Sequence, residues 1–534
     1  MIRDDLAEAV RSALVALAVE PLPEQVAMER PANPDHGDWS SNVALASAKK
    51  AGRNPRELAT QLVEHLNANP PAHVESVEIA GPGFVNFRLA PTWLHEVLAE
   101  VVDQGEAGYA APDLGAGKTV NVEFVSANPT GPVHAGHARG AAHGDSVARL
   151  FARTGHQVTR EFYINDRGVQ MQLYGASLAA RKAGEQPPEG GYQGEYITEW
   201  ASGMPDGVDP VAWGEDRALE DQREVLSAFG VDFDVWYREL SLVEAGLIEE
   251  ALADLRERGV VYEADGATWL RSTDFGDDKD RVLVKSDGEL TYLMPDIAYH
   301  RDKFSRADQL INIWGADHHG YVARMKAAMQ ALGHDPEELD VEIVQLVDLL
   351  KDGEPVKISK RSGNLIELRD VIEEVGADAA RLTYLLQSID SRQTVDLAVV
   401  ASQGMENPVF YVQMAHARIH GIARRAAEAG VTRSALADAD LSVLVHEREV
   451  ALLRILSDLP DVVAIATRDR APHKVTTWVR ELAGAFHGFY HDCYVIGEGI
   501  SPELTQARLW LVEASRIGFA IGLDLLGVSA PESM

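Results

Sequence analysis

The sequence is poor in cysteine and has no long apolar run. Cys493 is the only cysteine among 534 residues, so no disulfide can form within the chain and no cysteine cluster can bind a metal. No stretch reaches the roughly 18–20 uncharged apolar residues that span a bilayer. The first residues, MIRDDLAEAVRSALVAL, carry acids early and lack a small-residue cleavage site, which indicates an amphipathic helix rather than a signal peptide. We therefore expect a cytoplasmic protein with no membrane partner.

Basic residues are scarce relative to acidic ones. The chain has 49 Lys and Arg against 83 Asp and Glu, which gives a net charge of −34. Because neutralising phosphates requires Lys and Arg, this balance argues against a general nucleic-acid binder. A nucleic-acid partner would have to meet local basic patches. Two explanations of the acidity stay open, a solubilising surface and adaptation to high salt.

The length predicts about three domains. Helical patterning fills the start of the chain and Pro55–Asn67, and Val74–Leu89 alternates like a pair of strands interrupted at Gly81, Pro82 and Gly83. A stretch rich in Gly, Ala and Pro then indicates a linker. We expect an α+β N-terminal domain over residues 1–112.

A β-α-β unit follows this linker. Thr119–Ala127 alternates apolar and polar residues as a strand does, a small-residue helix is expected at Gly136–Thr154, and a second strand begins after Gly155. Strand, helix and strand of this length predict a right-handed crossover in a parallel sheet.

The sheet is expected to resume in three later segments. They are ELTYLMPDIA at 289–298, LINIWGADHHG at 310–320 and Val341–Leu350. The intervening stretch of about 190–285 is rich in Gly, acids and Trp and is interpreted as an insertion. From Asp370 nearly every segment has a helical pattern. The predicted fold class is therefore α/β, with a Rossmann-like parallel-sheet domain at 113–395 and an all-helical domain at 396–534.

Two histidines lie at the turn between the first strand and the helix, in the tetrapeptide His134, Ala135, Gly136, His137. A helix N-terminus presents free N–H groups and a partial positive charge, which favours phosphate. Gly136 lets a nucleotide approach the backbone closely, and both imidazoles can donate hydrogen bonds to an α-phosphate under attack. Taken alone, the pattern also fits two structural histidines or two zinc ligands, although zinc needs a third ligand.

A pair of lysines follows the last expected strand. Lys357 and Lys360 flank Ile358 and Ser359 after a short turn that contains Gly and Asp. Mobile positive charge over a pyrophosphate leaving group suits adenylyl transfer, in which positioning and charge stabilisation supply most of the catalysis. The alternative for this pattern alone is a solvated basic turn.

Together, HAGH and the later KISKRSGN resemble the two ATP-binding signatures of class I aminoacyl-tRNA synthetases, known as HIGH and KMSKS. Their order and their positions after sheet strands match that family. The resemblance implies an enzyme, because a non-catalytic relative would not need both motifs intact. Its ATP-binding and catalytic positions fall here on His134, Gly136, His137, Lys357, Ser359 and Lys360.

The surrounding segments are similar to arginyl-tRNA synthetases in particular. The similar segments are Val122–Gly140, Glu161–Met171, His36–Lys50, AGPGFVNFRL at 80–89, Asn407–Ile419 and the terminal LLGVSAPESM. The resemblance covers essentially the whole chain. It implies an arginine–tRNA ligase that uses ATP and Mg²⁺, forms arginyl-adenylate and transfers arginine to tRNA-Arg, with activation that needs bound tRNA. A paralogue serving a non-translational acceptor stays open as the alternative.

A guanidinium prefers carboxylates in bidentate geometry, and Glu123 lies near the C-terminal end of the first expected strand, where α/β sheets bind ligands. By resemblance, Glu123, Tyr292 and Asp296 would line the pocket for the arginine side chain, and Asn128 would hold its α-amino or carboxylate end. Less defined roles in arginine binding fall on Asp317 and His318. The alternatives for Glu123 and Asp296 are a structural ion pair and a solvent-facing position on a strand.

The same resemblance implies tRNA contacts at both ends of the chain. In residues 1–112, Phe84 and Asn86 suit base stacking and base-edge hydrogen bonds; the alternatives are core packing for Phe84 and a turn position for Asn86. The candidates for anticodon contact are Tyr411, Gln413 and His416. The chain departs from the family at Tyr494 and Ser533, where basic residues are common. A monomer is expected.

Overall fold

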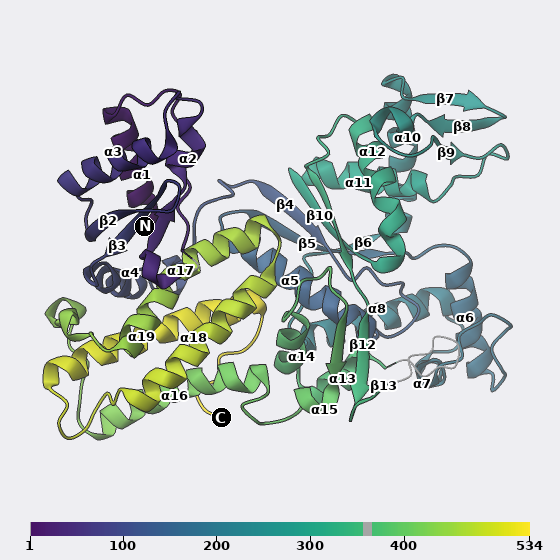
Figure 1. Cartoon of the computed structure of the whole chain (residues 1–534). Helices are drawn as coiled ribbons and strands as arrows, with labels where there is room; N and C mark the ends of the chain where they lie inside the picture. Colours follow the sequence, from purple (N-terminus) through teal and green to yellow (C-terminus); the bar gives the residue numbers. More distant parts are fainter. Residues whose placement is uncertain (1, 32, 356–365) are drawn as a thin grey trace. The chain divides into compact units, whose positions relative to one another are not determined.

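The computed structural model describes residues 2–31, 33–355 and 366–534 (Figure 1). Val356–Leu365, which includes the predicted residues Lys357, Ser359 and Lys360, lies outside the described residues. The chain forms two compact units, each assembled from several segments. The first contains Met1–Asp103, Thr432–Ser457 and Phe489–Ala514; the second contains Gln104–Val431, Asp458–Gly488 and Ser515–Met534.

The first unit contains a three-stranded antiparallel sheet in the order β1-β3-β2. Helix α3 begins at Pro55 because Asn54 caps it: the Asn54 side chain accepts hydrogen bonds from the N–H groups of Arg56 and Glu57. The hairpin and the α+β character are as the sequence predicts. The elements are α1 (Ile2–Ala16), β1 (Trp39–Ser41), α2 (Val43–Ala48), α3 (Pro55–Ala68), β2 (Val74–Ala80), β3 (Phe84–Leu89) and α4 (Thr92–Gly108).

The second unit is built on a five-stranded parallel sheet in the order β11-β10-β4-β5-β6. Its strands are β4 (Thr119–Glu123), β5 (Gln157–Ile164), β6 (Val235–Arg238), β10 (Gln309–Gly315) and β11 (Leu339–Val344). In chain order, the first strand of this sheet is the central strand β4. Strands β5 and β6 follow on one side of it, and β10 and β11 follow on the other side. The direction of winding therefore switches between β4 and β10, where sheets of this kind bind ligands beyond the C-terminal strand ends.

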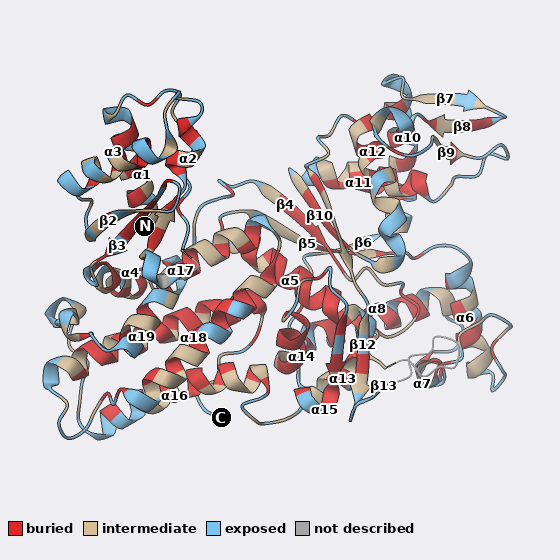
Figure 2. Cartoon of the chain, in the orientation of Figure 1, coloured by how far each residue is buried: buried red, intermediate tan, exposed pale blue. Residues whose placement is uncertain are grey.

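Helices α5 (Ala138–Arg153) and α11 (Leu293–Arg306) cover opposite faces of this sheet. Phe124, directly after β4, packs so tightly on Gly144 of α5 that a Cβ there would lie 2.3 Å from the Phe124 ring. Glu123, one residue earlier, points to the other face and reaches Lys303 of α11. Figure 2 shows the resulting layer of buried residues along the strands and α5.

The structure corrects the sequence prediction in three places. The segment 289–298, predicted as a strand, contains the start of α11, because its buried residues follow a helical spacing at Leu293, Met294, Ile297 and Ala298. The strand predicted at Val341–Leu350 is divided between β11 and β12 (Val347–Lys351), which belong to different sheets. The insertion predicted at about 190–285 contains β6, a strand of the main sheet.

Two small sheets and the remaining helices complete the chain. The sheets have the orders β13-β12-β14 and β7-β8-β9. The remaining strands are β7 (Val261–Ala264), β8 (Ala267–Leu270), β9 (Arg281–Val284), β13 (Glu354–Pro355) and β14 (Gln393–Asp396), and the remaining helices are α6 (Val169–Lys182), α7 (Glu195–Gly203), α8 (Pro210–Ala228), α9 (Glu239–Glu244), α10 (Leu247–Glu257), α12 (Val322–Ala331), α13 (Leu368–Val375), α14 (Ala377–Tyr384), α15 (Leu397–Val400), α16 (Pro408–Glu428), α17 (Glu447–Arg468), α18 (Pro472–Asp492) and α19 (Pro502–Leu526). The helical pattern predicted after Asp370 is thus confirmed except at β14. Among the described residues, no helix has the length and apolar character to span a membrane.

Candidate active site

The HAGH turn forms a short 3-10 turn, η2 (Ala135–His137), that leads directly into α5. His134 caps this turn, and its Nδ1 accepts a hydrogen bond from the Gly136 N–H at 3.1 Å. An accepting Nδ1 means that a neutral ring carries its proton on Nε2. The rings of His134 and His137 stack with their centroids 3.8 Å apart, so both imidazoles lie on one side of the turn, as the sequence suggests.

Gly136 is exposed, and its hydrogen atoms leave room for the His134 ring. A Cβ at Gly136 would lie 2.9 Å from the Nδ1 and Cε1 atoms of His134. Any larger residue would therefore displace the first histidine of the turn. The glycine is required by the stacked histidines themselves, in addition to any ligand that approaches the backbone.

The HAGH turn is joined by backbone hydrogen bonds to the segment that follows the lysine motif. The Ala135 N–H donates to the carbonyl of Ile366 at 2.9 Å, and the Leu368 N–H donates to the carbonyl of Val133 at 2.8 Å. His134 and Glu367 face each other in this antiparallel bridge. Ile366 is the first residue that the structure describes after 356–365, so the described pairing of the HAGH turn is with Ile366–Leu368.

A cavity of about 810 Å³ opens beside this bridge. Its walls come from the turn after β4, from His134 and His137, from Glu367, and from a Gly- and Tyr-containing stretch before and at the start of α7. Among the wall residues that the sequence did not predict are Gln170, Tyr192, Tyr196 and Glu367. Gln170 lies in a segment that resembles the synthetase family, so that resemblance could have identified it. Tyr192 and Tyr196 lie in the expected insertion, where no sequence motif marks them as site residues.

The loop between β4 and the HAGH turn has a strained backbone, and side chains from α7 and α8 donate hydrogen bonds to its carbonyl groups. Val125 and Ser126 have φ angles of 70° and 43°, which are unfavourable for side chains with a Cβ and which cluster at functional sites. Gln222 of α8 donates to the carbonyls of Asn128 and Gly131, both at 3.0 Å. Tyr196 donates to the carbonyl of Thr130 at 2.9 Å.

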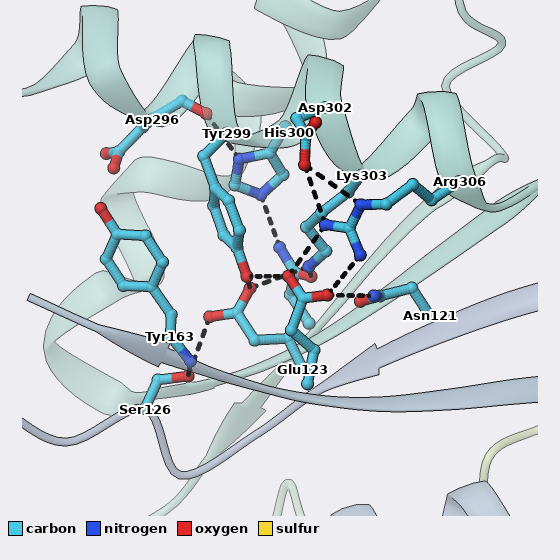
Figure 3. Close-up of polar contacts among 12 residues, drawn as sticks. Asn121, Glu123, Ser126, Tyr163, Asp296, Tyr299, His300, Asp302, Lys303 and Arg306 are labelled. Atoms are coloured by element: carbon cyan, nitrogen blue, oxygen red, sulfur yellow. Dashed lines mark hydrogen bonds and ion pairs between the residues drawn. The ribbon is translucent and has the colours of Figure 1, made fainter. Parts of the chain in front are cut away.

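Glu123 is the last residue of β4 and is only 4% exposed. Its Oε2 accepts hydrogen bonds from Lys303 Nζ at 2.8 Å and from the Tyr299 hydroxyl at 3.2 Å. Its Oε1 accepts one from the Ser126 hydroxyl at 3.0 Å. The ion pair considered as an alternative from the sequence is therefore present (Figure 3).

Asp296 lies in the first turn of α11, near Glu123. The Tyr321 hydroxyl donates to its Oδ2 at 2.6 Å. Burial, followed by the negative charges of Glu239 and Glu123, raises the pKa of Asp296 to about 7. An acid in such surroundings is more stable as the carboxylate when a cationic ligand arrives.

The other predicted arginine-binding residues are more exposed. Tyr292, just before α11, is 92% exposed. Asn128 lines the cavity and donates to Gln170 Oε1 at 2.7 Å. Asp317 and His318 lie in an exposed 3-10 segment after β10, and His318 Nε2 is 3.7 Å from Asp317 Oδ2. Glu123 and Asp296 thus lie close enough for the Glu123 charge to raise the pKa of Asp296, whereas the other four residues are exposed.

Comparison with known families agrees with this geometry. A model of the "tRNA synthetases class I (R), catalytic domain" matches residues 98–189 and 220–420. A model of the "Arginyl tRNA synthetase N terminal domain" matches residues 2–89, and the "DALR anticodon binding domain" matches 412–534. The chain belongs to the class I arginyl-tRNA synthetase family.

Individual relatives in this family match the chain from end to end. The arginine–tRNA ligase of Geobacillus thermodenitrificans is 47% identical, with 100% of this chain and 99% of the relative aligned. That of Bacillus subtilis is 45% identical with the same coverage. The solved structure of Thermus thermophilus arginyl-tRNA synthetase covers both chains completely with a TM-score of 0.79 at 24% identity, which supports the fold.

In the part that matches the family's N-terminal domain, the two predicted tRNA-contact residues differ in environment. Phe84, at the start of β3, is 38% exposed. Asn86 is buried, and its Oδ1 accepts a hydrogen bond from the Ser40 hydroxyl at 2.7 Å. Phe84 is therefore available for stacking, whereas Asn86 is engaged in holding β1 to β3.

The three predicted anticodon residues lie on α16 and also differ. Tyr411 lines a cavity of about 480 Å³ with Arg480 and other residues. Gln413 is buried and donates to Asp378 and to the carbonyl of Ser529. His416 is buried beside the carbonyl of Pro531 at 2.9 Å. These contacts tie α16 to the chain terminus, while Tyr494 and Ser533 are exposed.

Proposed function

We propose that this enzyme is an arginine–tRNA ligase that acts in two steps. The arginine carboxylate attacks the α-phosphate of ATP, which gives arginyl-adenylate and diphosphate. The terminal ribose hydroxyl of tRNA-Arg then takes the arginyl group and releases AMP. The observation that carries this proposal is the backbone pairing of the HAGH turn with Ile366–Leu368 beside a cavity lined by the loop that follows β4.

In the first step, ATP enters as its Mg²⁺ complex, because Mg²⁺ usually binds through substrate phosphates and a few waters. His134 and His137 stabilise the charge that develops on the α-phosphate. Their stacking supports this role, since both donors reach the same side of the turn. Gly136 leaves the backbone open to the nucleotide, and Lys357, Ser359 and Lys360 bind the β- and γ-phosphates.

Arginine binds at the junction of β4 and α11. Asp296 and Glu123 accept the guanidinium, with the exposed Tyr292 covering it. Asn128, in the wall of the cavity, holds the α-amino or carboxylate end. Asp317 and His318 bound the same region from the end of β10. This arrangement places the arginine carboxylate toward the HAGH turn.

The two ends of the chain bind the tRNA. Phe84 stacks on a base of the outer corner with Asn86 beside it, and Tyr411 contacts the anticodon from the cavity on α16, with Gln413 and His416 behind it. The domain boundaries at 112/113 and 395/396, a monomeric state and a cytoplasmic location belong to the same proposal. Activation is expected to need bound tRNA, so pyrophosphate exchange without tRNA should stay near background.

A charging assay with purified tRNA-Arg and labelled arginine tests the proposal. The wild type should charge tRNA, and His137→Ala should lower kcat by about 10²–10³. ATP hydrolysis without charging would favour the paralogue that serves another acceptor. An unchanged rate in His137→Ala would remove the HAGH turn from the mechanism.

A further inference from the structure

Three buried polar residues lie in one row across the main sheet. Asn312 of β10 is paired in register with Glu123 of β4, and Glu123 with Glu161 of β5. All three are buried. Two carboxylates at directly neighbouring strand positions repel each other, and burial makes an uncompensated charge costly. Helix α11 must therefore supply the compensating groups.

Helix α11 provides one cation for each carboxylate. Lys303, which is 0% exposed, donates to Glu123 at 2.8 Å and to Asn312 Oδ1 at 2.6 Å. Arg306 donates to both oxygens of Glu161, at 2.7 and 3.2 Å. Figure 3 shows Lys303 and Arg306 side by side, with Glu123 below them.

Lys303 also connects Glu123 to the helical turn that carries Asp296. Asn312 Nδ2 lies 2.7 Å from His300 Nε2, and His300 Nδ1 lies 2.7 Å from the carbonyl oxygen of Asp296. Burial and the charge of Lys303 lower the pKa of His300 to about 4. The neutral ring then donates from Nδ1 to Asp296 and accepts at Nε2 from Asn312. This fixes Asn312 with its oxygen toward Lys303.

The two oxygens of Glu123 have different surroundings. Oε2 receives the donors Lys303 and Tyr299, whereas in the described part of the chain Oε1 receives the Ser126 hydroxyl. A carboxylate oxygen has about two acceptor directions. Oε1 therefore keeps one acceptor direction that none of these hydrogen bonds uses.

We propose that Lys303 is a positioning residue of the arginine site. It holds Oε2 and neutralises the row, so that Glu123 stays ionised with Oε1 turned to the substrate guanidinium. Through Asn312 and His300 it fixes the turn of Asp296 as well. The inference rests on the proposed function, in which Glu123 is an arginine ligand. The competing explanation is that Lys303 only stabilises the fold, as Arg306 does.

Lys303→Met tests this inference with Arg306→Met as the matched control. Each substitution removes one cation of α11 from one carboxylate of the row. Lys303→Met should raise the arginine KM by about tenfold or more and leave the KM values for ATP and tRNA within about twofold. Arg306→Met should lower thermal stability with the arginine KM within about twofold. Lys303→Arg, which keeps the charge, should recover part of the loss.

A double-mutant cycle shows whether Lys303 acts through Glu123. In a Glu123→Gln background, Lys303→Met should change the arginine KM by less than about twofold. This double variant buries no unpaired carboxylate at position 123 and so remains measurable if Lys303→Met alone does not fold. Asn312→Leu keeps the lysine charge but removes its second acceptor, and should raise the arginine KM by about threefold or more.

An arginine KM that stays at the wild-type value in Asn312→Leu and Lys303→Met overturns the inference. So does a Lys303→Met effect that is fully retained in the Glu123→Gln background. Either result would leave the proposed function intact, provided that the wild type charges tRNA-Arg. Failure of the wild type to charge any tRNA would instead remove the proposed function.

Discussion

Asp296 is a half-buried carboxylate whose surroundings suit a cationic ligand. Its charged neighbours, Glu239 and Glu123, are both negative, and its hydrogen-bond donor is the neutral hydroxyl of Tyr321. Arg167 pairs with Glu239 and Lys303 with Glu123. Since those acids have cations of their own, Asp296 is the natural counter-ion for the incoming guanidinium.

Arginine binding should therefore depend on pH between 6 and 8. With a pKa of about 7, Asp296 is protonated in much of the free enzyme at pH 6 and must lose that proton when a guanidinium binds. Below the pKa, each pH unit should weaken arginine binding by up to about tenfold, and above it the affinity should level off. Calorimetric titration in two buffers of different ionisation enthalpy would measure the proton released.

Asp296→Asn should remove the pH dependence and raise the arginine KM at pH 8 by about 100-fold. A wild-type affinity that is constant over this range would contradict the assignment.

Helix α5 depends on one glycine for its distance from the sheet. A methyl group at Gly144 would overlap the ring of Phe124, which follows Glu123. We expect Gly144→Ala to destabilise the protein by about 1–3 kcal/mol and to lower kcat, since α5 begins at the HAGH turn. Gly421→Ala in α16 is the control, because its nearest neighbour would be an Arg424 nitrogen at 3.9 Å; it should be neutral or stabilising by about 0.4–1 kcal/mol. Thermal unfolding and charging rates of the two variants test this. Equal behaviour would show that the Phe124 contact is unimportant.

Elements with a clear local pattern were predictable, and those defined by tertiary contacts were not. The strand that ends at Glu123 follows from the alternation of apolar and polar residues, and the helix after His137 follows from the turn that precedes it. The sequence predicts a strand where α11 begins, because the short apolar run around Pro295 fits both the helical and the strand spacing of apolar residues. Long-range packing decides between the two. The four-residue strand β6 has too little sequence to be distinguished from a loop.

The candidate site was predictable to the same degree. The two histidines lie at the predicted turn before a helix and Glu123 at the end of the predicted strand, whereas Asp296 lies on a helix and not on the predicted strand; their binding roles stay predictions. Tyr192 and Tyr196 reach the cavity through a chain path that no local pattern encodes. The partners of Glu123 on α11 could not be predicted either, because strand register determines which helix residues face it.

At the scale of the whole molecule, Arg381 of α14 connects distant segments of the second unit. It is fully buried, donates to Asp145 of α5, and also donates to the carbonyls of Phe229 and Leu526. Arg381→Met would leave the Asp145 charge without this partner and should cost about 3–5 kcal/mol. Arg433→Met, which breaks a partly exposed pair with Glu513, should cost less than about 1 kcal/mol. Chemical denaturation would compare the two. Equal losses would contradict the central role of Arg381.

The bond from Arg381 to Leu526 also sets an order of events during synthesis. Leu526 is the last residue of α19 and lies 145 residues after Arg381 in the chain, so its carbonyl leaves the ribosome well after the guanidinium. Domains generally fold as they emerge, starting from the N-terminus. The Arg381 guanidinium is therefore synthesised long before the Leu526 carbonyl that accepts its hydrogen bond. Until Leu526 is present, the charge of Arg381 lacks one of its hydrogen-bond partners. Chaperones that protect unfinished chains should therefore be most important for this enzyme in the interval between the synthesis of α14 and that of α19.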